Sequence, residues 1–199
     1  DWFDPANWDG AAIPGVYDRV VVSNASCQIL RPAEIDLASL TLANGASLMV
    51  GATGSVETVY LPISPLDVRP YHLSVSGEVL VRDNAGLVLG GVNATSRVDL
   101  AVGGDLVLTN GATLRVAAGF AGSVTNRSTY IDGGAGVVVR GNTLIGTNCW
   151  VYPSCHQASG APVVFDLQNL FVMTNSGFNA NYHGFGRIGE SYYGLGYTS

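Results

Sequence analysis

Hydrophobic residues alternate with small or polar residues through the middle of the chain, and this alternating pattern occurs twice. Residues 73–91 and residues 100–119 align at an offset of 27 (100 minus 73), which places Leu73 on Leu100. A period of two is typical of β-strands with one buried face, and the Gly and Asn-Gly positions that interrupt it are typical of turns. No helical stripe competes with this pattern. It therefore predicts short strands joined by turns.

The repeated unit is too short to bury its own apolar side, and this constraint predicts a β-solenoid in which successive coils stack. Residues 35–50 form a further coil of the same kind, with a turn at Asn44-Gly45. The inward-facing positions of this coil are expected to be Leu40, Leu42, Leu48 and Val50. Later apolar runs recur about every 30 residues, so we predict an all-β fold with one solenoid domain over residues 1–178 and about five or six coils.

Large aromatic residues precede the first predicted strand. Trp2, Phe3 and Trp8 come before the β-branched run at residues 20–22. The first coil of a solenoid would otherwise expose apolar surface and unpaired backbone groups. We therefore expect residues 1–22 to include an N-terminal cap in which these aromatic side chains cover the open end.

Two further segments depart from the repeat. Residues 55–71 contain Pro62, Pro65 and Pro70, and Pro removes hydrogen bonds from a central strand, so this segment is expected to leave the solenoid as an excursion. It is either a plain surface loop or a functional one. Residues 179–199 are rich in Gly and Tyr and contain too few aliphatic residues for another coil. This tail either folds over its own solenoid or docks on a neighbour.

The N-terminal segment contains Asn7-Trp8, Pro14-Gly15, Asp18 and a run of valines. This pattern resembles the start of many secreted bacterial right-handed parallel β-helix proteins, including autotransporter-passenger-like and pectin-lyase-like surface proteins. In those proteins it precedes coils similar to the one at residues 40–48, and the resemblance extends over residues 1–120. It implies a right-handed parallel β-helix and supports the fold far more than any activity.

Composition and charge exclude some classes of function. The chain has 199 residues, of which 47% are hydrophobic and 12% are charged, and a formal net charge of −6. Its nine basic residues are all Arg and are scattered, which is unlike the clustered basic surface of a nucleic-acid groove. No apolar run approaches the roughly 20 residues of a membrane helix, so no membrane insertion is expected.

The sequence begins at Asp1 rather than Met, from which we expect a processed, secreted protein located outside the cell or on its surface.

Three cysteines are present. Cys149 and Cys155 are separated by five residues, and this spacing predicts a small loop closed by a disulfide, with Cys27 unpaired or intermolecular. The alternative is three buried thiols, because Cys often behaves as a core residue.

Candidate catalytic residues are sparse. Glu78 and Asp105 occupy equivalent positions in successive coils, which favours a repeated solvent-facing turn over the facing carboxylates of a glycoside hydrolase. A polysaccharide lyase generally uses a basic residue to abstract a proton, but the chain has no Lys. Arg82, Arg115 and Arg140 lie far apart in the sequence, although stacked coils would bring them closer.

Potential metal ligands are also sparse. His156 and the neighbouring Cys149 and Cys155 offer only a weak match to a zinc site, and no dense acidic loop favours calcium. We therefore predict no catalytic residues, no metal and no cofactor.

Three glycosylation sequons begin at Asn24, Asn93 and Asn126. Each lies at a predicted turn, where a glycan would point outward. These asparagines are candidate glycosylation sites, although Asn, Ser and Thr are common enough here to produce such triplets by chance.

These observations favour an extracellular structural protein that assembles with copies of itself into a filament or fibre, or that forms an adhesin-like module. A head-to-tail contact that does not close a ring gives a filament, and the ends of a solenoid supply such contacts. The expected interface consists of aromatic residues from the two ends of the chain: Trp2, Phe3, Trp8, Phe178, Tyr182, Phe185, Tyr192, Tyr193 and Tyr197.

The alternative is a carbohydrate-binding or polysaccharide-cleaving β-helix module, with surface glycans as its partners. Sugar rings would stack on exposed aromatic residues drawn from Tyr71, Tyr130, Trp150 and Tyr152. A third hypothesis is a monomeric fragment of a larger surface protein.

Overall fold

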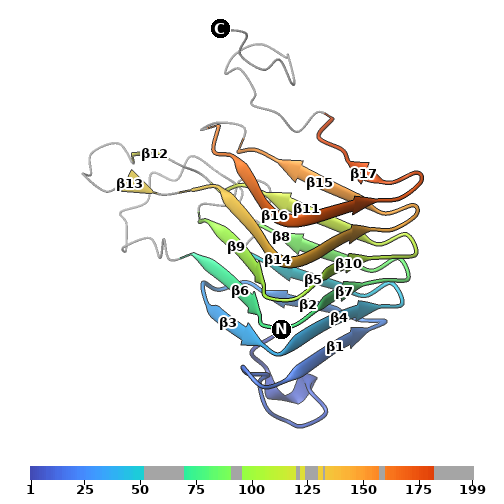
Figure 1. Cartoon of the computed structure of the whole chain (residues 1–199). Coiled ribbons are helices and arrows are strands. Elements are labelled where there is room, and N and C mark those ends of the chain that lie inside the picture. The colour runs from blue at the N-terminus through green and yellow to red at the C-terminus, as the bar shows by residue number, and fades with distance from the viewer. Residues whose placement is uncertain are drawn as a thin grey trace, which may run out of the picture.

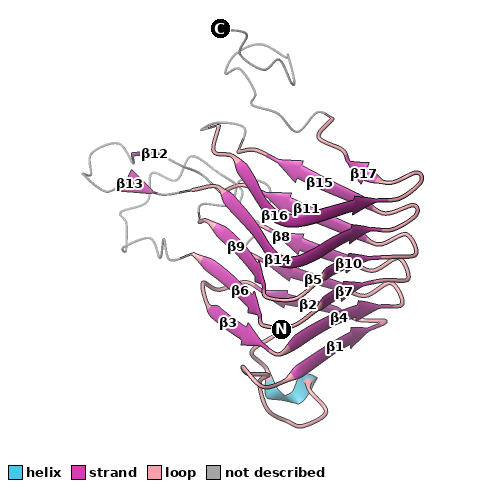
Figure 2. Ribbon diagram, viewed as in Figure 1, coloured by secondary structure: helices cyan, strands magenta, loops and turns pink. Residues whose placement is uncertain are grey.

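The protein is all-β in a computed structural model that describes residues 1–51, 70–90, 96–119, 122–123, 130–131, 133–156 and 160–181. These residues form seventeen strands and one short 3-10 helix, η1 (Pro5–Asn7), and they contain no α-helix. Figure 2 shows η1 at one end of the stacked strands. The predicted all-β class is confirmed.

Most strands belong to three parallel ladders. The first ladder contains β1 (Arg19–Ser23), β4 (Ser39–Ala43), β7 (Val79–Val81), β10 (Leu106–Leu108) and the second halves of β14 (Ala135–Ile145) and β16 (Val163–Val172). The second ladder contains β2 (Ser26–Ile29), β5 (Ser47–Val50), β8 (Gly86–Leu89), β11 (Thr113–Ala117), β15 (Trp150–Ser154) and β17 (Gly177–Phe178). The third ladder contains β3 (Glu34–Leu37), β6 (Tyr71–Val75), β9 (Val98–Val102) and the first halves of β14 and β16.

The long strands β14 and β16 pass from the third ladder into the first, so these two ladders form a single nine-stranded sheet. The second ladder is a separate six-stranded sheet. A small antiparallel pair, β12 (Gly122–Ser123) and β13 (Tyr130–Ile131), lies outside both. Figure 1 shows the ladder strands side by side, with β1 to β3 at one end and β16 and β17 at the other.

The chain visits the three ladders in a constant order, and each strand pairs in parallel with the equivalent strand of the next round. Between β6 and β9 the pairing register joins Leu73 to Leu100 and Val75 to Val102. This is the 27-residue offset of the sequence repeat, so the repeat predicted the strand register. Because a slip of one residue would turn every side chain to the opposite face, the apolar period fixes this register.

The inward-facing side chains stack in columns that form the core. One column in the first ladder contains Leu42, Val81, Leu108 and Ile145, which are all completely buried. Leu40, Leu48 and Val50 are also buried, so all four inward positions predicted for residues 35–50 are confirmed. At about 25 cal/mol per Å² of apolar surface, burial along such columns is the main stabilising term of the fold.

Glycine forms the corner between the third and first ladders. The N–H of Gly104 donates to the carbonyl of Gly77 at 3.0 Å, and the N–H of Gly141 donates to that of Gly104 at 3.0 Å. A Cβ on Gly104 would lie 2.8 Å from the backbone of Gly77, which is closer than real Cβ contacts allow. The backbones therefore approach at this corner in a way that requires glycine.

Asparagine forms the corner between the first and second ladders. Asn44, Asn110, Asn148 and Asn175 all have positive φ angles, between 53° and 60°. The side-chain amides of Asn44, Asn110 and Asn175 donate to a residue one round earlier, as when Asn175 donates to Oδ1 of Asn148 at 2.6 Å. The predicted Asn44-Gly45 turn is confirmed, because the short Asn side chain tolerates this conformation and Gly adopts it without strain.

The excursion predicted at residues 55–71 falls between β5 in the second ladder and β6 in the third. Residues 52–69 lie outside the described part of the chain, so the excursion itself stays a prediction. Its predicted last residue is wrong, because Tyr71 is the first residue of β6 and is only 4% exposed.

The predicted disulfide between Cys149 and Cys155 is wrong. Both residues, and Cys27, are free thiols. The five residues between them form β15, and six residue steps of extended strand separate their Cα atoms by about 20 Å. A disulfide needs Cα atoms within about 7 Å, so no local bridge can form. The alternative of buried thiols describes Cys27 and Cys149, whereas Cys155 is half-buried.

We predict that reduction does not change stability. Three thiols are expected to react with an alkylating reagent in denaturant without prior reduction, and dithiothreitol is expected to leave the melting temperature unchanged. In the native protein, burial raises the pKa of the Cys27 and Cys155 thiols, which lowers the thiolate fraction and slows alkylation near pH 8. Mass spectrometry of the alkylated chain checks this, and fewer than three labelled cysteines would contradict it.

Candidate functional site

The two ends of the ladders are the candidate functional surfaces, and they differ in how well the core is covered. At the first end, every inward residue of β1, β2 and β3 is buried, with exposed fractions from 0% to 8%. The cover is the segment before β1. Trp2 is 0% exposed and belongs to the core, and its backbone N–H donates to the carbonyl of Gln28 in β2 at 3.0 Å.

Other aromatic residues hold this cap in place. The rings of Trp2 and Trp8 meet edge to face with centroids 4.9 Å apart, and Nε1 of Trp8 donates to the carbonyl of Trp2 at 2.9 Å. The guanidinium of Arg31 lies 3.8 Å from the centroid of the Phe3 ring. The predicted lid is therefore present. However, Trp2 cannot contact another protein directly, because its side chain is fully enclosed, so its predicted interface role is wrong.

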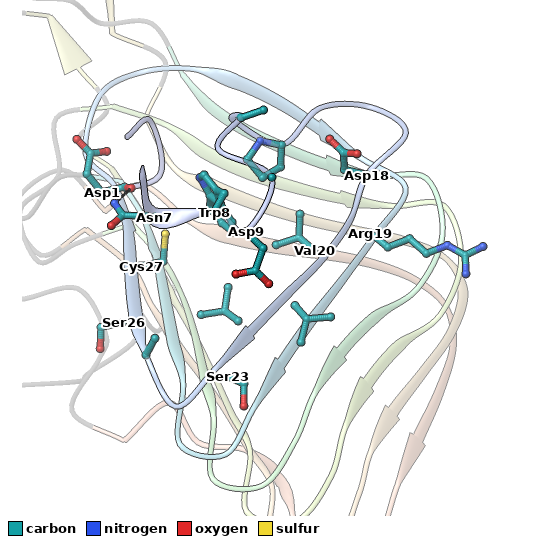
Figure 3. Close-up of a pocket in the computed structure, with 16 residues that line it drawn as sticks. Asp1, Asn7, Trp8, Asp9, Asp18, Arg19, Val20, Ser23, Ser26 and Cys27 are labelled. Carbon is teal, nitrogen blue, oxygen red and sulfur yellow. Dashed lines mark hydrogen bonds between the residues drawn. The ribbon is translucent and has the colours of Figure 1, made fainter. Parts of the chain in front are cut away.

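A hollow of about 650 Å³ lies between the cap and the first two strands. Figure 3 shows Val20 and Cys27 along its wall and the carboxylate of Asp9 directed over it, whereas Arg19 points away. Asp1 and Asp18 also line the hollow. Its combination of apolar wall and carboxylate rim disfavours an anionic ligand.

At the opposite end, the final inward residues of the first and second ladders are exposed, whereas those of the third ladder, Val163, Phe165 and Leu167, are half-buried. Leu170 and Val172 pair with the buried residues Thr143 and Ile145, yet they are 45% and 47% exposed. Phe178, which pairs with buried Val151, is 41% exposed. Phe178 packs edge to face on Phe165 at 5.2 Å between centroids, but no described strand lies beyond either residue. This end of the core is open in the part of the chain that the structure describes.

Strand β16 is also an exposed edge. It has ten residues, pairs with β14 along one side and has no described partner on the other. Outward-facing Val164 and Phe171 add apolar surface, with exposed fractions of 53% and 54%. A long apolar edge strand of this kind is a template for pairing with another chain. We call the exposed surface of β16, Met173 and Phe178 the open end.

Charge is distributed unequally between the two ends. The first 18 residues contain four carboxylates and no basic residue, and the carboxylates belong to Asp1, Asp4, Asp9 and Asp18. The charged side chains described between residues 133 and 181 are those of Arg140 and Asp166, apart from the titratable His156. Arg140 and Asp166 form an ion pair at 3.0 Å. The open end is therefore close to neutral.

A second candidate surface lies on the outer face of β15. Trp150 and Tyr152 alternate with buried Val151, so both face outward, and both are half-buried. The exposed guanidinium of Arg115 lies 4.8 Å from the centroid of the Tyr152 ring. Of the aromatic residues predicted to stack on sugars, Tyr71 is wrong, because it is buried and its hydroxyl donates to the carbonyl of Leu30 at 3.1 Å. The side chain of Tyr130 lies outside the description.

The residues of the candidate catalytic arrangements have separate environments, although Glu78 and Asp105 lie in adjacent rounds. Glu78 is exposed, whereas Oδ1 of Asp105 accepts hydrogen bonds from the backbone and side-chain nitrogens of Asn142 at 2.7 and 3.3 Å. The three arginines have separate partners: Arg82 pairs with Asp83, Arg115 stacks on Tyr152 and Arg140 pairs with Asp166.

The described residues contain no group of three or more His, Cys, Asp or Glu side chains that could hold a metal ion. Cys149 and Cys155 lie at opposite ends of β15, which separates these two potential zinc ligands. His156 is buried, and loss of solvation lowers its pKa from the ordinary value. A neutral imidazole is therefore favoured at this position.

Other predicted sites fall partly outside the described residues. Asn24 is exposed in a turn with a φ angle of 53°, which is an accessible position for a glycan. Asn93 and Asn126 are not described, and neither are the tail residues predicted at the interface, which are Tyr182, Phe185, Tyr192, Tyr193 and Tyr197.

Comparison of the chain with protein-family models, with curated proteins and with solved structures finds no match. In the described part of the chain, no helix has the length and apolar character needed to cross a membrane.

Sequence reasoning missed Leu170 and Val172 at the open end. Both occur in an apolar run and continue the inward alternation of the preceding repeats. The available signal was that no similar strand pattern follows residue 178 in the sequence, so the repeat itself supplies no further strand to cover the last inward positions.

We predict that the cap is a stability element. Replacing Trp2 with Ala should lower the free energy of unfolding by about 3–5 kcal/mol, because it removes a fully enclosed aromatic side chain. The matched control is Tyr17→Ala, since Tyr17 belongs to the same segment but is 91% exposed, and its change should stay within about 0.5 kcal/mol. Urea unfolding followed by circular dichroism measures both. Equal effects of the two substitutions would show that Trp2 does not seal the core.

Proposed function

We propose that this chain is an extracellular, non-catalytic structural module that associates with copies of itself, as a subunit of a surface filament or fibre or as an adhesin-like module. The observation that carries the proposal is the open end, where Leu170, Val172 and Phe178 expose the last layer of an otherwise buried core. Apolar surface of this kind, beside an unpaired edge strand, favours association. The extracellular location is supported by the resemblance to secreted β-helix proteins.

The fold proposed for this module is a short right-handed β-solenoid. Three observations support it: the constant order in which the chain visits three parallel ladders, the matching register along each ladder, and the repeated Gly and Asn corners. Such a solenoid has two ends and grows by stacking, which makes its ends natural sites of assembly.

Self-association is tested by size-exclusion chromatography with light scattering over a range of concentrations, beside negative-stain electron microscopy. The wild-type chain should give species larger than the monomer. Val172→Lys should shift the product towards monomer, because it places a charge on the 47% exposed apolar end at little cost to folding. The control is Val21→Lys on β1, where Val21 is 63% exposed and faces outward, and this variant should associate normally. A wild-type chain that remains monomeric would contradict the proposal.

A second candidate function is carbohydrate binding at the outer face of β15. The observation that favours it is the pair Trp150 and Tyr152, which lie about 7 Å apart on one face of a strand with the Arg115 guanidinium beside them. Aromatic faces provide apolar contact area for a sugar ring, and the guanidinium provides hydrogen-bond donors for its hydroxyl groups.

Binding to a glycan array tests this second function. The wild-type chain should retain at least one glycan, and Tyr152→Ala should weaken that binding about tenfold or more through loss of the stacking face. Tyr17→Ala, which removes an exposed aromatic residue from the cap, should bind as the wild type does. If both variants bind the glycan equally, the binding site does not include Tyr152. If the wild-type chain binds no glycan on the array, the carbohydrate-binding function is ruled out.

A further inference from the structure

We infer that two copies of this chain associate open end to open end, about a two-fold axis, with β16 of one copy beside β16 of the other. This inference rests on the proposed function, because it takes the partner to be a second copy of the chain. It goes beyond that function by assigning the surface and the symmetry of the contact.

The first argument is the difference in burial between the ends. Inward residues at the capped end are at most 8% exposed, whereas Leu170, Val172 and Phe178 at the open end are 41% to 47% exposed. Association is driven by removal of apolar surface from water, so the end that still exposes such surface gains more from a partner. Contact between two open ends covers both exposed layers at once.

The second argument is that the capped end is a poor partner for the open end. The backbone N–H of Trp2 donates to the carbonyl of Gln28, which lies on the outer edge of β2, so a neighbouring copy cannot use that carbonyl to extend the second ladder. The first 18 residues also carry four carboxylates without a basic residue. A head-to-tail contact would place these carboxylates against an apolar end that offers no free cation among its described residues, because Arg140 is paired with Asp166.

The third argument is the geometry of the edge. A two-fold axis perpendicular to a strand brings the two copies of that strand together in antiparallel orientation, which gives a regular hydrogen-bond ladder. Strand β16 has ten residues with one unpaired side in the described structure, and this length suits such pairing. An isologous contact closes on itself. It therefore produces a rod of two modules with both Trp2 caps at the outside, and any longer assembly would use other surfaces.

A charge-exchange experiment at Gln168 tests the symmetry. Gln168 is exposed in the single chain, so Gln168→Lys and Gln168→Glu should leave the fold intact. Centred antiparallel pairing of β16 places Gln168 diagonally next to Gln168 of the second copy, close to the two-fold axis, so each variant alone should dimerise about tenfold or more weakly than the wild type. A mixture of the two variants should restore a dimer containing one copy of each.

The outcomes separate the inference from the proposed function. Two results would overturn the inference but not self-association. In the first, the wild type associates but the mixture restores no dimer. In the second, Val21→Lys at the capped end blocks association, which would show that the contact is not isologous. If the wild type is monomeric at every concentration, both the inference and the proposed function fail. A dimer restored only by the mixture supports both.

Disulfide trapping provides an independent measurement. Val164 is the second residue of β16 and Phe171 is the second from its end. If the two copies of β16 pair in antiparallel orientation along their full length, Val164 lies opposite Phe171 of the second copy. The variant Val164→Cys with Phe171→Cys, in a Cys155→Ser background, should form covalent dimers on oxidation and no longer multimers. Head-to-tail stacking would leave both engineered thiols without a partner, so the absence of covalent dimers from an associating variant would overturn the inference.

Discussion

The structure depends on stacking of inward-facing apolar side chains in register along three parallel ladders. A single round of three short strands has an apolar side but nothing to cover it, so each round is stable only against its neighbours. The columns through Leu42 and Leu100 show the result, since their members are fully buried wherever a strand lies on both sides. Glycine and asparagine at two corners allow the backbone to turn at the same point in every round.

The same dependence makes the ends of the ladders the sites where the molecule must either seal itself or bind something else. Trp2 seals the first end by entering the core, and Trp8 and Phe3 with Arg31 hold it there. At the other end, β16 and Phe178 leave the last apolar layer exposed in the described chain. This asymmetry connects the packing of the fold to its proposed role, because association at the open end completes a core that the chain has already built.

The sequence was less informative about the candidate surfaces than about the ladders. It placed Trp2, Phe3 and Trp8 in a lid, but it could not show that Trp2 is enclosed and therefore unable to form an intermolecular contact. It also treated Tyr71 as accessible, whereas Tyr71 takes the first inward position of β6. Both errors have one cause. The exposure of an aromatic side chain depends on neighbouring strands distant in sequence, and the local pattern does not contain them.

The sequence by itself determined the all-β class, the 27-residue register between β6 and β9, and the inward positions of residues 40–50, because period-two alternation and turn residues act locally. Tertiary structure alone decided that Cys149 and Cys155 lie at opposite ends of a strand. The same number of residues between two cysteines can form a tight loop, which brings them together, or an extended strand, which holds them far apart. Tertiary structure also decided which end is closed. That outcome depends on whether a further layer packs against the last strand, and this is a property of contacts between distant parts of the chain.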